Sequence, residues 1–122
     1  MNSQTGIDGL TERSDFHAQT VTVDRDVYAW LLRQVADSMA RGIHTSQSEI
    51  VEISIRELME NPQDAPSRVE RRRGDYVSRT FRLSAETWSW LHEERVRRLS
   101  SGRHDGAMSQ IVASALRRSM VK

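Results

Sequence analysis

Polar and apolar residues alternate strictly in two short stretches of the chain. Residues 20–23 read Thr-Val-Thr-Val, and residues 80–83 read Thr-Phe-Arg-Leu. A period of two is typical of a β-strand that buries one face. We therefore predict two strands, each with one face toward a core. The inward side chains are Val21, Val23, Phe81 and Leu83, and the outward side chains are Thr20, Thr22, Thr80 and Arg82.

A helix with an apolar stripe follows each predicted strand. Asp24 and Ser84 end the strands, and both residue types are good N-caps. Gly42 and Gly102 stand where a glycine at C′ ends such a helix. Apolar residues recur at intervals of three or four, as on one face of a helix. The stripes expected to be buried comprise Val27, Tyr28, Leu31, Leu32, Val35, Ala36 and Met39 in the first helix, and Trp88, Leu91, Val96 and Leu99 in the second.

A further helix follows each of these helices after a short loop. Ser46-Gln47-Ser48-Glu49 has the form of a capping box and precedes an apolar stripe. The corresponding helix near the C-terminus has a weaker predicted start, at Asp105 or Gly106. Asn61-Pro62 ends the earlier one. The chain is thus divided into a disordered N-terminal arm (1–16), a first strand–helix–helix module (17–60), a polar linker (61–76) and a second module (77–122).

The two modules are related copies. A shift of 60 residues aligns the strands, Trp30 with Trp90, and Gly42 with Gly102. After one extra residue near Gly106, a shift of 61 aligns the last helices. The two shifts give ten identities over about 42 positions, whereas average composition gives about three by chance. We interpret the chain as a tandem repeat, and the matched tryptophans as core or interface residues.

One strand with two helices cannot satisfy its own backbone groups, so each strand needs a partner. The chain supplies that partner itself, because about 16 linker residues can span up to roughly 50 Å. The predicted fold is therefore mainly α, with a two-stranded antiparallel ribbon backed by four helices in a single intrachain unit with pseudo-twofold symmetry. The sequence does not distinguish strands that pair within one chain from strands that are swapped between two chains.

Charge is distributed unevenly along the 122 residues, although the net charge is only +1. Residues 1–16 carry −2 and residues 17–60 carry −3, whereas residues 61–76 carry +1 and residues 77–122 carry +5. An anionic partner is therefore expected mainly on the second copy.

The composition excludes several classes of protein. The chain has no cysteine, which excludes disulfides, thiolate zinc sites and cysteine nucleophiles. No apolar run approaches the roughly 18 residues of a membrane span, and the N-terminus has no signal-peptide pattern, so we expect a cytoplasmic protein without a membrane partner. The spacing of His17, His44, His92 and His104 fits no common metal site. We expect no enzyme activity, no cofactor, no metal and no small-molecule substrate.

The residues resemble one known family, the ribbon-helix-helix (Arc/MetJ-type) DNA-binding proteins. Thr80-Phe81-Arg82-Leu83-Ser84 is similar to the family's ribbon, and Gly42 through Val51 is similar to its loop and second-helix start. The resemblance covers residues 17–60 and 77–122. Two copies in one chain is similar to the arrangement in conjugation relaxosome accessory proteins. The resemblance implies sequence-specific binding of double-stranded DNA, by a transcriptional repressor or by a plasmid or mobile-element DNA-processing accessory protein.

The same resemblance implies a set of DNA contacts. The ribbon would lie in the major groove, where the base pairs are distinguishable. Arg82 is able to make a bidentate contact with guanine. Base contacts are expected from Ala18, Thr20, Thr22, Ser78, Thr80 and Arg82. Phosphate contacts are expected from the helix starts, at Ser46, Gln47 and Ser48 and at Ala107, Met108 and Ser109, and from Arg79, Arg103 and the Arg71-Arg72-Arg73 run.

Two alternatives stay open from the sequence. The first copy is net acidic and has no outward cation, so either the ribbon reads a non-palindromic half-site or the first copy is a scaffold for the second. The other alternative is an antitoxin-like interaction module that uses the ribbon unit as a scaffold, with residues 1–16 as its candidate binding arm. On DNA, two chains could self-associate on adjacent sites. Arg95, Arg97 and Arg98 are expected to form an exposed helix face rather than DNA contacts.

Overall fold

The computed structural model describes residues 16–62 and 75–121 of the chain. It is mainly helical, with one two-stranded antiparallel sheet and four helices. In chain order the elements are β1 (Phe16–Asp24), α2 (Arg25–Ala40), α3 (Gln47–Glu60), β2 (Tyr76–Ser84), α4 (Ala85–Ser100) and α5 (Met108–Met120). Residues 1–15 of the predicted arm and residues 63–74 of the predicted linker lie outside the described residues.

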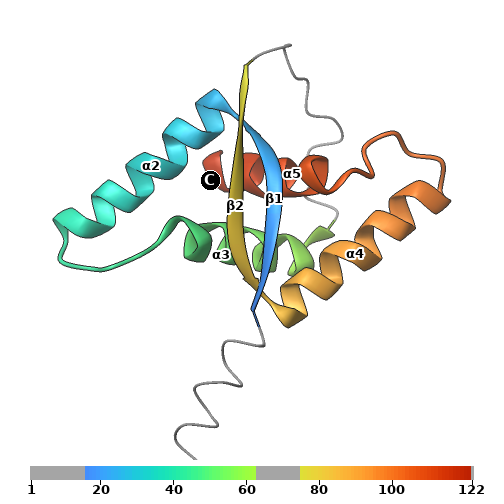
Figure 1. The fold of residues 1–122 in the computed structure, drawn as a ribbon, viewed down its shortest axis with the longest axis horizontal. Helices are drawn as coiled ribbons and strands as arrows, with labels where there is room; N and C mark the ends of the chain where they lie inside the picture. The colour runs from blue at the N-terminus through green and yellow to red at the C-terminus, as the bar shows by residue number, and fades with distance from the viewer. Residues whose placement is uncertain (1–15, 63–74, 122) are drawn as a thin grey trace, which may run out of the picture.

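The two strands cross in front of the helices as a twisted ribbon (Figure 1). β1 and β2 pair antiparallel with Thr20 opposite Thr80 at the centre, which confirms the predicted pairing. Both strands are longer than the alternation suggested. They begin at Phe16 and Tyr76, so one residue of the predicted arm and one of the predicted linker belong to the ribbon.

The core lies between the ribbon and the helices α3 and α5. α3 contacts β2 and α5 contacts β1, so each of these two helices covers the strand of the other copy. The four inward residues that the alternation predicted, Val21, Val23, Phe81 and Leu83, are all buried. Burying one such side chain contributes about 1.5–3 kcal/mol to folding. Trp30 and Trp90 are partly buried and pack against this core, as expected.

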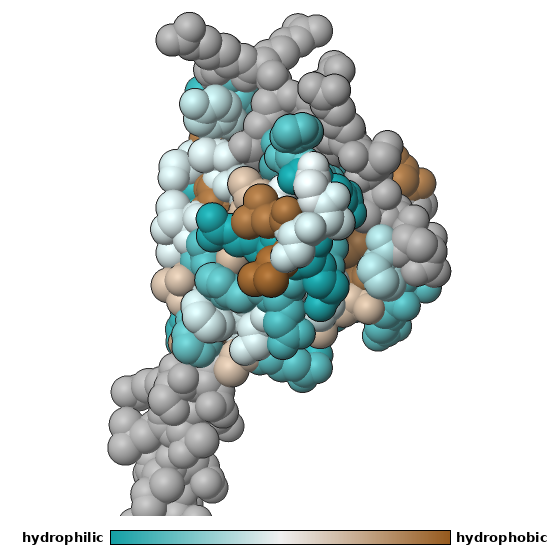
Figure 2. Space-filling model, turned by 90° about the vertical axis from the view of Figure 1, so that its right-hand side faces the viewer, coloured by the Kyte–Doolittle hydropathy of each residue, from teal (hydrophilic) through white to brown (hydrophobic). Residues whose placement is uncertain are grey.

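The predicted helix stripes are only partly buried. Val27, Leu31 and Leu91 belong to the core, but Met39 and Leu99, near the helix ends, are more than half exposed. Leu32, Ala36 and Val96 are exposed too, so for these five residues the prediction was wrong. The reason is that α2 and α4 extend beyond the ribbon on opposite sides (Figure 1). Viewed from the side on which α4 projects, apolar side chains lie at the surface among hydrophilic ones (Figure 2).

The helix ends follow local chemistry. The Ser46 side chain accepts the backbone N–H of Glu49, and the Glu49 carboxylate accepts the backbone N–H of Ser46, so the predicted capping box is present. Gly42 and Gly102 adopt φ of +75° and +79°, the left-handed conformation that favours glycine at C′. These two terminations are also as predicted.

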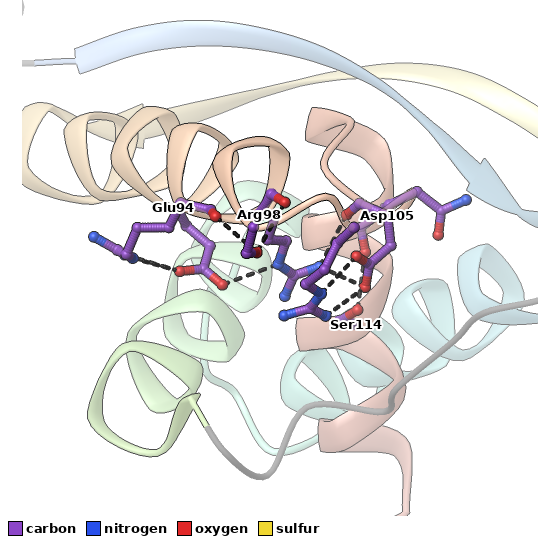
Figure 3. A network of polar contacts seen from close by, with 8 residues as sticks. Glu94, Arg98, Asp105 and Ser114 are labelled. Atoms are coloured by element: carbon purple, nitrogen blue, oxygen red, sulfur yellow. Dashed lines mark hydrogen bonds and ion pairs between the residues drawn. The ribbon is translucent and has the colours of Figure 1, made fainter.

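The start of α5 differs from the prediction. The helix begins at Met108 after Ala107, not at Asp105 or Gly106. Asp105 instead accepts hydrogen bonds from Arg98 and Arg103, which hold the preceding loop (Figure 3). Arg98 was expected on an exposed face but is only 2% exposed, because Glu94 and Asp105 compensate its charge inside the protein.

Candidate nucleic-acid interface

The outer face of the ribbon brings together the side chains predicted to contact bases. At its centre the hydroxyls of Thr20 and Thr80 lie 2.7 Å apart and form a hydrogen bond. On one side of this pair Ala18 lies opposite Arg82, and on the other Thr22 lies opposite Ser78. These are short side chains except for Arg82, and all but Thr22 are exposed. The result is a narrow ridge of hydroxyl groups with one guanidinium group away from its centre.

An aromatic ring supports that guanidinium group. The Arg82 guanidinium carbon lies 5.3 Å from the centroid of the Phe16 ring, within the range of a cation–π contact. The Phe16 side chain is 46% exposed, and Tyr76, at the matching position of β2, is 43% exposed. The sequence interpretation missed both residues. The signal was available, because both continue the even-numbered outward positions of their strands by one further step.

The starts of α3 and α5 flank the ribbon on its two sides. The Ser48 hydroxyl oxygen accepts the backbone N–H of Arg82 at 2.9 Å. The Ser109 hydroxyl oxygen accepts the backbone N–H of Thr22 at 2.9 Å. These two hydrogen bonds join residues at matching positions of the two copies. They place the predicted phosphate-contacting segments 46–48 and 107–109 beside the predicted base-contacting strands.

The two helix starts differ in charge. α3 carries Glu49 in its first turn, and the carboxylate of that residue already occupies the helix terminus through the capping box. A hollow of about 500 Å³ beside it is lined by Phe16, Ser46, Ser48, Glu49, Glu52 and Arg82. α5 has no acidic residue in its first turn, and its N-cap Ala107 has no side chain that could cap it. Because a helix N-terminus favours anions, the start of α5 is the more favourable neighbour for a phosphate.

Arg79 and Arg103, which were predicted to contact phosphates, both have partners within the protein. Arg79 is at an odd-numbered strand position, and its guanidinium carbon lies 4.7 Å from the centroid of the Tyr28 ring. A hydrogen bond with Arg79 lowers the pKa of the Tyr28 hydroxyl from its usual value. Arg103 forms an ion pair with Asp105, which compensates its charge locally. The Arg71-Arg72-Arg73 run lies outside the described residues.

Other kinds of site find little support in the described part of the chain. There, no group of three or more His, Cys, Asp or Glu side chains is placed to hold a metal ion. His17 stacks on Trp88 with ring centroids 4.5 Å apart, and His92 contacts the same indole. None of the helices in residues 16–62 and 75–121 has the length and apolar character to cross a bilayer.

The chain has no match among known protein families, curated proteins or solved structures. An assignment of function therefore depends on the ridge and the helix starts described above.

Proposed function

We propose that the chain is a tandem ribbon-helix-helix protein that binds double-stranded DNA sequence-specifically, with its β-ribbon in the major groove. The observation that carries the proposal is the exposed ridge of Thr20, Thr80 and Arg82, flanked on both sides by a helix N-terminus. Paired strands lie about 4.8 Å apart. Such a ribbon fits a major groove about 12 Å wide and leaves room for outward side chains to contact base edges.

The chemistry of the ridge suits base recognition. The guanidinium group of Arg82 can donate two hydrogen bonds to O6 and N7 of guanine, which discriminates by about 1–3 kcal/mol. The threonine hydroxyls can donate or accept, and their methyl groups can contact a thymine methyl group. The starts of α3 and α5 would lie near the phosphates on the two sides of the groove. No group in this scheme needs to break a covalent bond, so the proposed protein is a binder and not an enzyme.

The asymmetry of the ridge favours a non-palindromic site. Arg82 stands on β2 only, and its counterpart on β1 is Thr22. The carboxylates of Glu49 and Glu52 line the hollow on the β2 side, whereas the start of α5 on the β1 side has no acid in its first turn. The DNA site that we propose therefore has a guanine on one side of its centre, and the stronger phosphate contact of the protein lies on the other side. Such a protein would act as a repressor or as an accessory protein in the processing of mobile DNA.

The test is a selection of bound sequences from random duplex DNA, followed by binding measurements on the selected site. Arg82→Ala should lose about 10-fold or more in preference for the selected guanine, which follows from the discrimination of one bidentate contact. Arg95→Ala removes the same charge from an exposed position on α4 and serves as the matched control. If the folded wild-type protein fails to bind any duplex at low salt, the proposed function is wrong.

A further inference from the structure

A cluster of polar side chains joins α3 to the start of α4. The Glu52 carboxylate accepts the backbone N–H of Ser84 at 3.0 Å, the Ser84 hydroxyl at 2.8 Å and the Thr87 hydroxyl at 2.6 Å. It also accepts a hydrogen bond from Arg56 at 2.6 Å. Burial opposes the ionisation of Glu52, but these donors outweigh it and lower its pKa below the usual value. We call Glu52, Arg56, Ser84 and Thr87 the Glu52 cluster.

A different cluster joins α5 to the start of α2. The Arg117 guanidinium group donates to Asp26 at 2.6 Å and to Asp24 at 3.1 Å. The Asp24 carboxylate is buried, so a compensating cation matters there. A hydrogen bond with Arg117 is the main cause that lowers the pKa of Asp26. We call Arg117, Asp24 and Asp26 the Arg117 cluster.

The two clusters occupy matching positions of the two copies but differ in chemistry. Arg56 matches Arg117, and each stands one helical turn after a further matched position. That position is Glu52 in α3, which contacts the end of β2, and the buried Ala113 in α5. At the strand ends, Ser84 and Thr87 match Asp24 and Val27. Arg56 also forms an ion pair with Glu86, which matches Asp26, so an arginine meets a carboxylate in both clusters. The clusters differ because α3 has Glu52 where α5 has Ala113, and because hydroxyl groups at one strand end replace Asp24 and Val27 at the other.

Pairing each copy with itself would mismatch these groups. In a pair of two first copies, Glu52 would face Asp24 and Val27, so Glu52, Asp24 and Asp26 would share Arg56 as their cation, and the hydroxyl donors would be missing. In a pair of two second copies, Ala113 would face Thr87, whose hydroxyl is fully buried and would lose its acceptor. Both like-charge contact and an unsatisfied buried hydroxyl are unfavourable.

We propose that the Glu52 and Arg117 clusters determine partner choice, so that each copy fits the other copy and rejects a second copy of itself. The first copy therefore fits a partner that has hydroxyl donors at the end of its strand. The last helix of that partner carries an arginine and has no acid beside it. The consequence is a ribbon that always pairs one β1 with one β2, and therefore always presents one Arg82. This inference does not depend on DNA binding.

The first test places the mismatch inside the intact chain. Ala113→Glu puts a carboxylate beside Asp24, and Ala113→Gln is the control of similar size without charge. At pH 7 the glutamate variant should unfold about 5 °C or more below the glutamine variant, because a third carboxylate is added to the two that share Arg117. Adding Asp24→Ser and Val27→Thr recreates the Glu52 environment and should restore the midpoint of the glutamate variant only. Equal midpoints for the two variants, or no selective restoration, would contradict the proposal.

The second test measures partner choice directly and leaves the residues of both clusters unchanged. A protease site placed within residues 63–74 of the otherwise wild-type chain allows the folded protein to be cut into its two copies. The cut protein is then unfolded in urea and refolded by dilution, and native mass spectrometry counts the pairs. Mixed pairs should exceed like pairs at least tenfold. A statistical 1:2:1 mixture, or no mixed pairs, would overturn the proposal.

Discussion

The loops before α3 and before α5 connect matching helices but are held by different means. In the second copy, Arg98 donates to Glu94 at 2.9 Å and to the carbonyl oxygen of Asp105 at 3.1 Å, so a buried network fixes the loop (Figure 3). In the first copy, Ser38 matches Arg98 and Thr45 matches Asp105, so neither of these charges is present. The start of α3 instead depends on its own capping box.

This comparison changes the meaning of the charge distribution. Arg97, Arg98 and Arg103 account for much of the positive charge of the second copy, yet all three form ion pairs with acids of the same copy. These acids are already counted in the excess of +5, but Arg117 pairs with Asp24 and Asp26 of the first copy, which compensates a further part of that charge. In the proposed complex, attraction to DNA would come from Arg82 and the start of α5 more than from a broad basic surface.

The strongest test of the comparison is Arg98→Ala. The change leaves Glu94 and Asp105 without their buried partner, so we expect a loss of about 3–5 kcal/mol in the free energy of unfolding. Ser38→Ala, at the matching position of the first copy, should change it by less than about 0.5 kcal/mol. Urea denaturation measures both. Similar small effects would mean that the network does not hold the second loop.

A smaller effect is expected at Glu52, which has no acidic counterpart in α5. Glu52→Gln should lower the free energy of unfolding by about 1–3 kcal/mol at pH 7, because charged hydrogen bonds to Ser84, Thr87 and Arg56 are weakened. The folded-state pKa of Glu52 is lowered, so its contribution is present above the unfolded value near 4.3. It is lost as the pH falls through the lower folded value. Urea titrations at pH 7 and pH 3 should show a smaller gap between wild type and variant at pH 3, and a constant gap would contradict this assignment.

The glycines that end α2 and α4 should behave alike despite the different loops. Gly42→Ala and Gly102→Ala each force an L side chain into a positive φ, at a cost of about 1–2 kcal/mol. No atom lies within 4 Å of the added Cβ at either position, so the cost is one of backbone conformation. Asparagine, which tolerates this conformation better, is the control at both sites. Thermal unfolding that shows a loss at one glycine only would break the equivalence of the two helix ends.

The two strands and most helix ends could be predicted because their causes are local. Alternation with a period of two placed Val21 and Phe81 in the core, and Ser46 with Glu49 carried the whole capping box. The exposed positions Met39 and Leu99 could not be predicted in this way. Periodicity identifies an apolar face, but whether another element reaches that face depends on how far the helix extends beyond the core.

The candidate site was predicted in part for the same reason. The outward threonines and Arg82 follow from alternation, whereas the Ser48 and Ser109 hydrogen bonds join residues distant in sequence. Phe16 was missed because it was assigned to the predicted disordered arm, 1–16, although it continues the outward positions of Ala18 and Thr20. Arg103 and Asp105 lie only two residues apart in the sequence. That Asp105 holds the loop follows only from its contact with the buried Arg98.

The smallest predicted effect separates the two helix starts. Glu49→Gln retains the capping box, since glutamine can take the place of glutamate, and removes the charge beside the hollow. If phosphates lie near both helix starts, this change should tighten DNA binding by about 2–5-fold at low salt, in line with one charge of 0.3–1 kcal/mol at a helix terminus. Glu93→Gln, on the exposed face of α4, is the control for net charge. Fluorescence anisotropy at low and high salt would show the gain of Glu49→Gln fading as salt screens the charges. An equal gain in both variants would assign the effect to net charge, and the two helix starts would then not differ in their approach to the duplex.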